Sequence, residues 1–340
     1  MARIGIIGGG AWGTALSLVV KRAGGDAVLW AREPDVVAAI NTRHENPVFL
    51  PGVRLDPAIE ATGEIGRAAD SADAVLLAMP AQHLRESTAA LSSVLKPGTP
   101  AVLCAKGIEN GSSALMSEIA AEILPGSPIA VLSGPTFAME VARGLPTAAT
   151  LACKDHDLAM RVARMLAGQR FRIYLSDDII GSQVGGAVKN VLAIACGITM
   201  GRKLGENARA ALITRGLAEM VRLGLAKGAR LATMMGLSGF GDLSLTCNSA
   251  QSRNTSLGIL LGQGVALDDA LARGGGVAEG AYSAQAVRQL AKRHEIDMPI
   301  CLAVDRIINL GANIDNVIAD LLDRPIREES DTSGPSVRNP

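Results

Sequence analysis

The sequence predicts an α/β protein with two domains, an N-terminal doubly wound, mostly parallel sheet and an all-helical C-terminal domain. Three observations support this fold class. Short apolar runs alternate with helical periodicity over residues 1–178, which is typical of a parallel sheet covered by helices. Residues 179–323 continue with helical periodicity and no convincing strand. The length of 340 residues is sufficient for two domains, each with its own core.

The chain opens with a strand, a glycine turn and a helix. Residues 3–7 are an apolar run, and helical periodicity follows the last glycine of the turn. Gly8, Gly10 and Gly13 occupy the G-x-G-x-x-G positions, which permit a tight turn, close approach of a pyrophosphate and close helix packing, respectively. The helix N-terminus adds free N–H donors and a positive dipole end. We therefore expect a Rossmann-type dinucleotide site; the alternative is a structural turn in another α/β protein.

The next strand, predicted at residues 27–30, ends near a residue that bears on cofactor choice. In an NAD-specific site an acidic residue at this strand tip, about 20 residues after the glycines, holds the ribose 2′-hydroxyl. This chain has Arg32 instead, and a guanidinium suits a 2′-phosphate, so NADP is favoured. Glu33 keeps NAD open, although its place before Pro34 favours a role at a helix start.

The rest of the first domain follows the same alternation. Residues 43–53 contain two prolines and are expected to form a loop over the cofactor. Further strands are predicted at 74–79, 101–105, 129–132, 147–152 and 171–175, with helices to about 95, from about 137, and at 156–166. Lys106 directly follows a strand, at the carboxyl edge where open α/β sheets place their ligands.

The second domain is expected to begin with its central helix, because residues 176–201 are apolar on most faces and rich in Gly and Ala. Lys189 and Asn190 lie midway along this segment. A buried lysine is costly unless a partner compensates it, so we interpret Lys189 as a functional residue facing a cleft rather than as an accident of the core. Residues 324–340 are polar, contain three prolines, and are expected to form a loose tail.

Composition excludes several classes of protein. Lys plus Arg and Asp plus Glu number 33 each, which leaves no net field to attract nucleic acid or an anionic membrane. The five cysteines are scattered, which predicts buried free thiols in a reducing cytosol, and neither they nor the four dispersed histidines have metal-ligand spacing. We find no secretory leader and no apolar run of the roughly 20 residues that a bilayer requires, so a cytoplasmic location is expected.

Five motifs carry a family resemblance: GGGAWGTAL at 8–16, AKGIE at 105–109, SGPTFAMEV at 133–141, AVKNVLAI at 187–194, and GDLSLTC with SRN within 241–254. Over residues 3–320 the chain resembles bacterial NAD(P)-dependent glycerol-3-phosphate dehydrogenases. The resemblance implies a 6-phosphogluconate-dehydrogenase-like pair of domains closing over a cleft, and it is compatible with a homodimer. It also implies reversible reduction of dihydroxyacetone phosphate to sn-glycerol 3-phosphate by NAD(P)H, a first step towards glycerophospholipids.

The resemblance assigns roles to individual residues. Lys189 matches the proton donor and acceptor, and Lys106 and Asp242 match residues that hold the reacting end of the substrate. The other substrate-binding positions are Gly134, Thr136, Asn190, Thr246, Ser252, Arg253 and Asn254. The cofactor-binding positions are Gly8, Gly10, Ala11, Trp12, Gly13, Arg32, Lys106, Ala138, Arg253, Val277 and Glu279.

The chain departs from the family pattern at positions that affect cofactor preference. Ala11 stands where the family usually has Ser, and Phe49 where Tyr is often found. Residues 281–283 read Ala-Tyr-Ser in place of the more usual Val-Arg-Thr. No reacting group is lost.

Two other functions stay open at this point. A β-hydroxyacid dehydrogenase would also carry a lysine on its central helix but would act on a carboxylate substrate, and the SRN segment and the adjacent Lys-Asn pair argue against it. A non-catalytic nucleotide-sensing module would not require Lys106, Lys189 and Asp242.

Overall fold

The computed structural model describes residues 1–273 and 276–326, and the chain separates into two units. The first unit comprises residues 1–106 and 115–183; the second comprises residues 107–114 and the described residues from 184 onward. The division falls inside a long helix, one to two turns after the predicted boundary at 178, and the sequence does not predict the assignment of 107–114 to the second unit. Of the predicted tail at 324–340, residues 327–340 lie outside the described residues.

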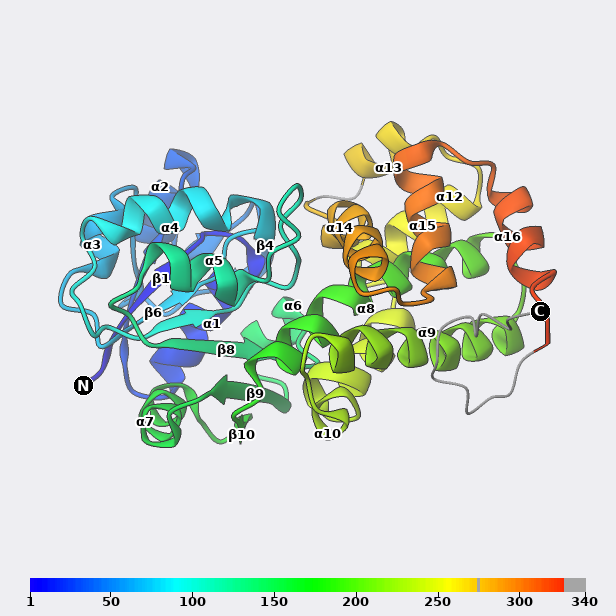
Figure 1. The fold of residues 1–340 in the computed structure, drawn as a ribbon. Coiled ribbons are helices and arrows are strands. Elements are labelled where there is room, and N and C mark those ends of the chain that lie inside the picture. The colour runs from blue at the N-terminus through cyan, green and yellow to red at the C-terminus, as the bar shows by residue number, and fades with distance from the viewer. Residues whose placement is uncertain (274–275, 327–340) are drawn as a thin grey trace. The chain divides into compact units, whose positions relative to one another are not determined.

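An eight-stranded sheet forms the centre of the first unit (Figure 1), in the order β10-β9-β8-β7-β6-β1-β2-β5. Every neighbouring pair is parallel except β8 and β9, which confirms the predicted mostly parallel sheet. The chain reverses after β8 through the short helix α6, and neither this reversal nor β5 is predicted by the sequence. The strands are β1 Arg3–Ile7, β2 Asp26–Trp30, β5 Glu60–Thr62, β6 Ala74–Leu77, β7 Ala101–Leu103, β8 Ile129–Ser133, β9 Thr147–Cys153 and β10 Phe171–Ser176.

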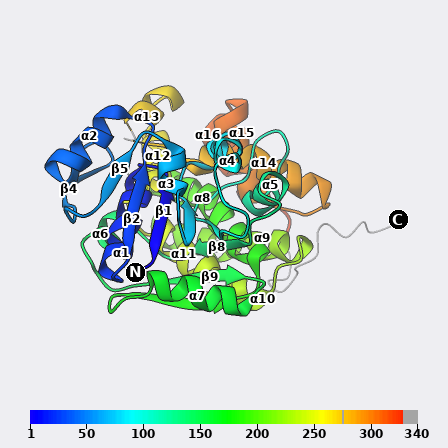
Figure 2. The same ribbon diagram turned by 90° about the vertical axis from the view of Figure 1, so that its left-hand side faces the viewer.

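Helices cover both faces of this sheet (Figures 1 and 2). On one face α1 (Ala11–Arg22) contacts α6 (Ala138–Ala142) and α7 (His156–Leu166). On the other, α4 (Leu84–Ser92) contacts α3 (Ile65–Ala69) and α5 (Met116–Ile123). α2 (Pro34–Arg43) packs against β5, and η1 (Ala81–His83) leads into α4.

The predicted loop at 43–53 is wrong, because this segment contains a β-hairpin. Strand β3 (Glu45–Asn46) pairs antiparallel with β4 (Leu50–Arg54) in a separate two-stranded sheet. The two prolines suggested a loop, but Pro47 lies in the turn and Pro51 lies in a strand with only one neighbouring strand. A proline is tolerated at such an edge, where its missing N–H breaks no ladder.

Every secondary-structure element that the structure describes in the second unit is a helix, while residues 107–114 are irregular. Its longest helix, α8 (Ile179–Gly201), is buried along most of its length, as expected for a central helix. The expectation that no apolar run could span a membrane is wrong, since α8 is long and apolar enough. However, 83% of its apolar window is buried, as in the core helix of a globular domain. The other elements are α9 Glu206–Ala226, α10 Leu231–Met234, η2 Leu237–Gly241, α11 Asp242–Cys247, α12 Arg253–Gly262, α13 Leu267–Arg273, α14 Glu279–Arg293, α15 Pro299–Leu310 and α16 Ile314–Leu322.

Glycines allow α8 to contact α12 backbone to backbone. A Cβ on Gly197 would lie 2.1 Å from the carbonyl oxygen of Thr255, and one on Gly201 would lie 2.3 Å from that of Ile259. A Cβ on Gly258 of α12 would lie 2.1 Å from the carbonyl oxygen of Ile194. Because these contacts leave no room for a methyl group, they fix where the first residues of α12 stand relative to α8.

All five cysteines are buried and free, as the sequence predicts. Within residues 1–273 and 276–326, no group of three His, Cys, Asp or Glu side chains could hold a metal ion.

Candidate functional site

The glycine turn has the geometry that a dinucleotide pyrophosphate requires. Gly8 has a φ of 129°, and a Cβ there would lie 2.8 Å from the backbone of Met79. A Cβ on Gly13 would lie 1.9 Å from the carbonyl oxygen of Gly8, so only glycine allows α1 to begin there. A Cβ on Gly10 would meet nothing within 4 Å, which leaves the open side of the turn where the phosphates would lie.

The sheet topology puts this turn at a switch point. β1 pairs with β2 on one side and with β6 on the other, so the strand order reverses at β1. Ligands of open α/β sheets bind at the carboxyl ends of the strands at such a point. The turn follows β1 directly and opens α1, with Gly10 as the N-cap residue.

Asn46 supports the glycine turn, and sequence reasoning missed it. This side chain is fully buried, and its Nδ2 donates to the carbonyl oxygen of Gly9 at 2.9 Å and to Oγ1 of Thr14 at 2.8 Å. Its Oδ1 accepts from the backbone N–H of Phe49 at 3.1 Å. The hairpin therefore holds the turn from outside. The local sequence gives no signal for this, since it shows only an asparagine before a proline.

Arg32 lies just beyond β2 with a side chain 73% exposed, and its Nη2 is 3.3 Å from Oε1 of Glu33. Glu33 is the N-cap residue of α2 and Pro34 its first residue, as the sequence predicts, but the Glu33 side chain makes no capping bond. An exposed pair of this kind contributes little stability, so Arg32 is available to a ligand. Trp12 packs on the core, and its indole N–H is buried without a partner.

Three predicted residues meet at the ends of β7 and β8. Nζ of Lys106 donates to the carbonyl oxygen of Gly134 at 2.8 Å and to Oγ1 of Thr136 at 3.3 Å. Gly134 has a φ of 143°, and a Cβ there would lie 3.1 Å from Cα of Ala149. The two strands are parallel neighbours, so their carboxyl ends lie side by side. Ala138 begins the next helix, α6, whose last carbonyl groups accept hydrogen bonds from Arg22.

Lys189 is buried in the second unit and paired with an acid. Its Nζ donates to Oδ1 of Asp242 at 2.7 Å and to Oγ1 of Thr246 at 2.8 Å. Lys189 is 7% exposed and Asp242 1% exposed. Oγ1 of Thr246 also donates to the backbone carbonyl of Asp242 at 2.6 Å, one helical turn away on α11. A buried ion pair costs solvation and is weak evidence for stability, so this arrangement favours a chemical role.

Asn190 and Asn254 join three helices. Nδ2 of Asn254 donates to Oδ1 of Asn190 at 3.0 Å, and Oδ1 of Asn254 accepts from the backbone N–H of Gly280 at 2.8 Å. A Cβ on Gly280 would lie 2.3 Å from the carbonyl oxygen of Asn190. Both asparagines are buried, so this network links α8, α12 and the start of α14.

Ser252 and Arg253 lie at the N-terminus of α12. Ser252 is the N-cap, and its Oγ accepts from the N–H of Thr255 at 3.3 Å. Burial of its charged group lowers the pKa of Arg253, while the Glu279 carboxylate raises it; arginine nevertheless stays charged at any ordinary pH. A Cβ on Gly276 would lie 2.8 Å from Nη1 of Arg253, so the stretch before Val277 and Glu279 lies against this guanidinium.

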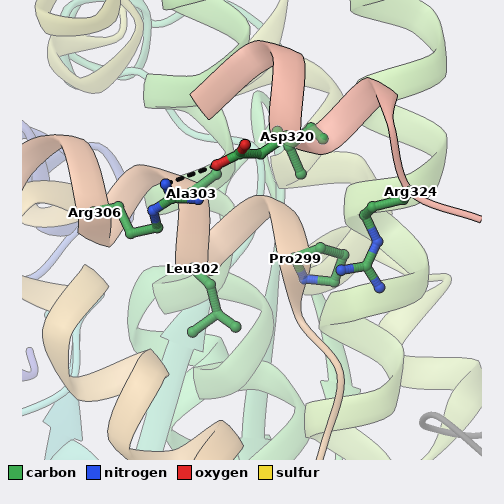
Figure 3. A pocket seen from close by; sticks show the side chains of 7 residues that line it. Pro299, Leu302, Ala303, Arg306, Asp320 and Arg324 are labelled. Carbon is green, nitrogen blue, oxygen red and sulfur yellow. Dashed lines mark hydrogen bonds and ion pairs between the residues drawn. The ribbon is translucent and has the colours of Figure 1, made fainter. Parts of the chain in front are cut away.

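A pocket of about 210 Å³ in the second unit contains none of the predicted residues (Figure 3). It lies between α15 and α16, and Nη2 of Arg306 is 2.8 Å from Oδ2 of Asp320 at its edge. Arg324 is also paired, with Oδ2 of Asp297 at 2.6 Å. The pocket is lined by Pro299, Leu302, Ala303, Arg306, Asp320, Leu321 and Arg324. Because both arginines are already paired with acids, we assign the pocket no part in the chemistry.

Comparison with known proteins identifies the family. Residues 3–159 match the family described as NAD-dependent glycerol-3-phosphate dehydrogenase N-terminus, and residues 178–319 match its C-terminus. The chain belongs to the NAD-dependent glycerol-3-phosphate dehydrogenase family. A glycerol-3-phosphate dehydrogenase (NAD(P)+) of Parvibaculum lavamentivorans is 53% identical, over 96% of this chain and 98% of that relative. One of Caulobacter vibrioides is 55% identical, over 96% and 99%.

Solved structures agree with this family. The crystal structure of glycerol-3-phosphate dehydrogenase from Coxiella burnetii has a TM-score of 0.91 and 40% identity, covering 94% of this chain and 98% of that one. A ketopantoate reductase from Ralstonia eutropha, 16% identical over 93% and 99% of the two chains, has a TM-score of 0.60 and shares the fold alone. In this chain the glycine turn and the Lys106 contacts lie in the first unit, and the Lys189 and Asn254 contacts lie in the second.

Proposed function

We propose that this member of the family catalyses reversible hydride transfer between NAD(P)H and dihydroxyacetone phosphate, giving sn-glycerol 3-phosphate. As an oxidoreductase of this family it uses NAD(P)H, which supplies the hydride. The observation that carries the proposal is the buried contact of Lys189 with Asp242 and Thr246. An acid and a hydroxyl hold this ammonium at a fixed place, as a proton donor requires.

Lys189 is the proposed general acid. Reduction of a ketone develops negative charge on its oxygen, and a nearby ammonium stabilises that charge and delivers a proton to the oxygen. Asp242 and Thr246 each accept an N–H bond of the ammonium, and these two bonds fix the position of Nζ. In the reverse direction the neutral amine accepts the proton of the alcohol.

Arg253 and the N-terminus of α12 are proposed to bind the substrate phosphate. A guanidinium presents a planar fork of donors that matches phosphate oxygens, and the first N–H groups of a helix attract anions. Asn254 is proposed to act at the same place, although its amide group is bonded to Asn190 and Gly280. Lys106, with Gly134 and Thr136, is proposed to hold the reacting end of the substrate.

The remaining parts of the proposal concern the whole protein. Residues 1–178 bind the cofactor through Gly8, Gly10 and Gly13, and residues 179–323 carry the proton donor and the phosphate site. Five buried free thiols fit a reducing, cytoplasmic compartment. We propose a homodimer and a product destined for glycerophospholipids.

The test is the loss of NADPH absorbance on adding dihydroxyacetone phosphate to the wild-type protein and to Lys189→Met. The variant removes the charge and the proton, so the chemical step should slow by about 10² to 10⁴-fold while NADPH binding survives. As a control, Lys292→Met replaces an exposed lysine of α14 and should leave turnover unchanged. If Lys189 served the core alone, the methionine would be tolerated with near-normal turnover. Turnover of hydroxy acids without a phosphate group would instead favour a β-hydroxyacid dehydrogenase.

A further inference from the structure

Gly185 of α8 contacts the segment that immediately precedes Asp242. Gly185 precedes Lys189 by four residues, so both positions share one face of α8. A Cβ on Gly185 would lie 2.3 Å from the carbonyl oxygen of Ser238 and 3.0 Å from Cα of Gly239. Both of these atoms belong to η2, the π-helical turn that ends immediately before Asp242. The backbones of α8 and η2 therefore touch at Gly185.

The η2 turn is also in close backbone contact with the end of α10. A Cβ on Gly239 would lie 1.9 Å from the carbonyl oxygen of Met234, at the end of α10. Ser238 and Gly239 are both buried. Because η2 has close backbone contacts with both α8 and Met234, and because α11 begins at its next residue, a shift of η2 away from α8 also moves the start of α11.

We propose that Gly185 is a positioning residue for the reaction. It sets how closely η2 approaches α8, and so sets the 2.7 Å contact of Lys189 with Asp242 and the 2.8 Å contact with Thr246. The proposal rests on the function proposed for Lys189. Gly197 and Gly201 face α12 instead, so they serve the approach of the phosphate-binding helix.

Gly185→Ala tests the proposal. The added methyl group must move η2 by about 1 Å, and a misplacement of that size can reduce turnover by about 10²-fold. We expect such a loss in kcat with dihydroxyacetone phosphate. NADPH affinity should not change, since the glycine turn belongs to the other unit, and the KM for the substrate should change little because Arg253 lies on α12.

Gly216→Ala is the matched control. Gly216 lies on α9, and a Cβ there would meet the terminal carbon atoms of Leu192 at 2.8 Å, a side chain of α8 that can rotate. This variant should lose thermal stability with near-normal kcat. If Gly185→Ala and Gly216→Ala lose the same thermal stability and the same kcat, the proposal is overturned. A normal kcat in Gly185→Ala would also overturn it.

A rescue separates positioning from general damage. Asp242→Glu alone should lower kcat, because its longer side chain crowds the Lys189 contact. In the Gly185→Ala background the extra methylene spans the added gap, so the double variant should turn over several-fold faster than Gly185→Ala. Independent effects of the two substitutions would show the opposite, a double variant slower than either, and would overturn the inference.

Two further results keep the test decisive. If Gly185→Ala does not fold, Gly236→Ala is a milder change at the N-cap residue of η2, since its Cβ would lie 3.3 Å from the carbonyl oxygen of Ala232 and would tighten the link between α10 and η2. It should lower kcat several-fold, and an unchanged kcat would overturn the proposal.

The same assays separate this inference from the proposed function. If the wild type fails to reduce dihydroxyacetone phosphate, the proposed function fails. If the wild type is active, Lys189→Met is inactive and Gly185→Ala is normal, the Gly185 inference alone fails.

Discussion

Among single residues, we predict that Arg32 separates the two cofactors. Its side chain is 73% exposed and pairs with the half-buried Glu33, so its removal should leave the fold intact. We predict that Arg32→Ala weakens NADPH binding by about 1.5 to 3 kcal/mol, the value of one charge-assisted contact to the 2′-phosphate. NADH binding should change little.

Titration of both reduced cofactors by fluorescence checks this. Arg164→Ala, an exposed arginine of α7 in the same unit, is the control and should bind both cofactors as the wild type does. Equal losses for NADPH and NADH in Arg32→Ala would place Arg32 away from the 2′-phosphate.

The sequence predicts the roles of some single residues and not of others. Lys189 stands out because a charged side chain in an apolar helix needs a partner, and the structure supplies Asp242. Gly8 and Gly13 are recognisable because a turn of fixed spacing requires them. Asn46 is not predictable, since its two donor bonds go to residues more than 30 positions away. The role of Gly185 depends in the same way on where a distant π-helical turn lies.

The β3–β4 hairpin is the element whose role follows most directly from its contacts. Asn46→Ala removes two donated hydrogen bonds, one of them to the buried carbonyl oxygen of Gly9. The free energy of unfolding should fall by about 1 to 3 kcal/mol. We predict weaker binding of NADPH and NADH by similar factors, because the shared pyrophosphate turn is loosened.

Asn41→Ala provides the comparison. Asn41 also makes two bonds, with the N–H and the carbonyl of Ala61, but these join α2 to β5 away from the glycine turn. It should lower the melting temperature and keep cofactor affinity. Full affinity in Asn46→Ala would show that the turn holds its shape without the hairpin.

Most elements of the first unit are predictable, because apolar runs ended by Gly or Pro mark β6 and β8, and Asp155 marks the start of α7 by capping Leu158. The direction of β9 is not, since its residues would read the same in a parallel strand. The hairpin at 43–53 escapes prediction because prolines in short edge strands and in loops give the same pattern.

At the scale of the whole molecule, Glu219 makes stability depend on pH. This carboxylate on α9 is 1% exposed and accepts from the backbone N–H groups of Ile300 at 2.7 Å and Cys301 at 3.0 Å, at the start of α15. Burial raises its pKa to about 7 from an ordinary 4.5, against the opposing effect of these donors and of Arg222. The folded protein therefore holds this proton more tightly than the unfolded chain.

It follows that the Glu219 contribution to the free energy of unfolding is fully present below about pH 4.5 and is lost as the pH rises to about 7. Glu219→Gln cannot ionise, so the variant should lack this part of the pH dependence. Its melting temperature relative to the wild type should rise between pH 5 and pH 8. Thermal unfolding across that range measures it, with the exposed Glu295→Gln as control. Parallel curves for wild type and Glu219→Gln would contradict the assignment.

The eight residues 107–114 make the chain hard to divide. They follow Lys106, yet they belong to the second unit, where Oγ of Ser113 is 2.6 Å from Oε1 of Gln289 on α14 and Ile108 is fully buried. If the chain were divided once near residue 180, residues 107–114 would stay with the first fragment, apart from the second unit against which they pack, and Ile108 would be exposed to water. Exchange of the second unit between relatives therefore requires two separate segments to be transferred together, 107–114 and the residues from 184 onward, so recombination at a single point cannot exchange it intact.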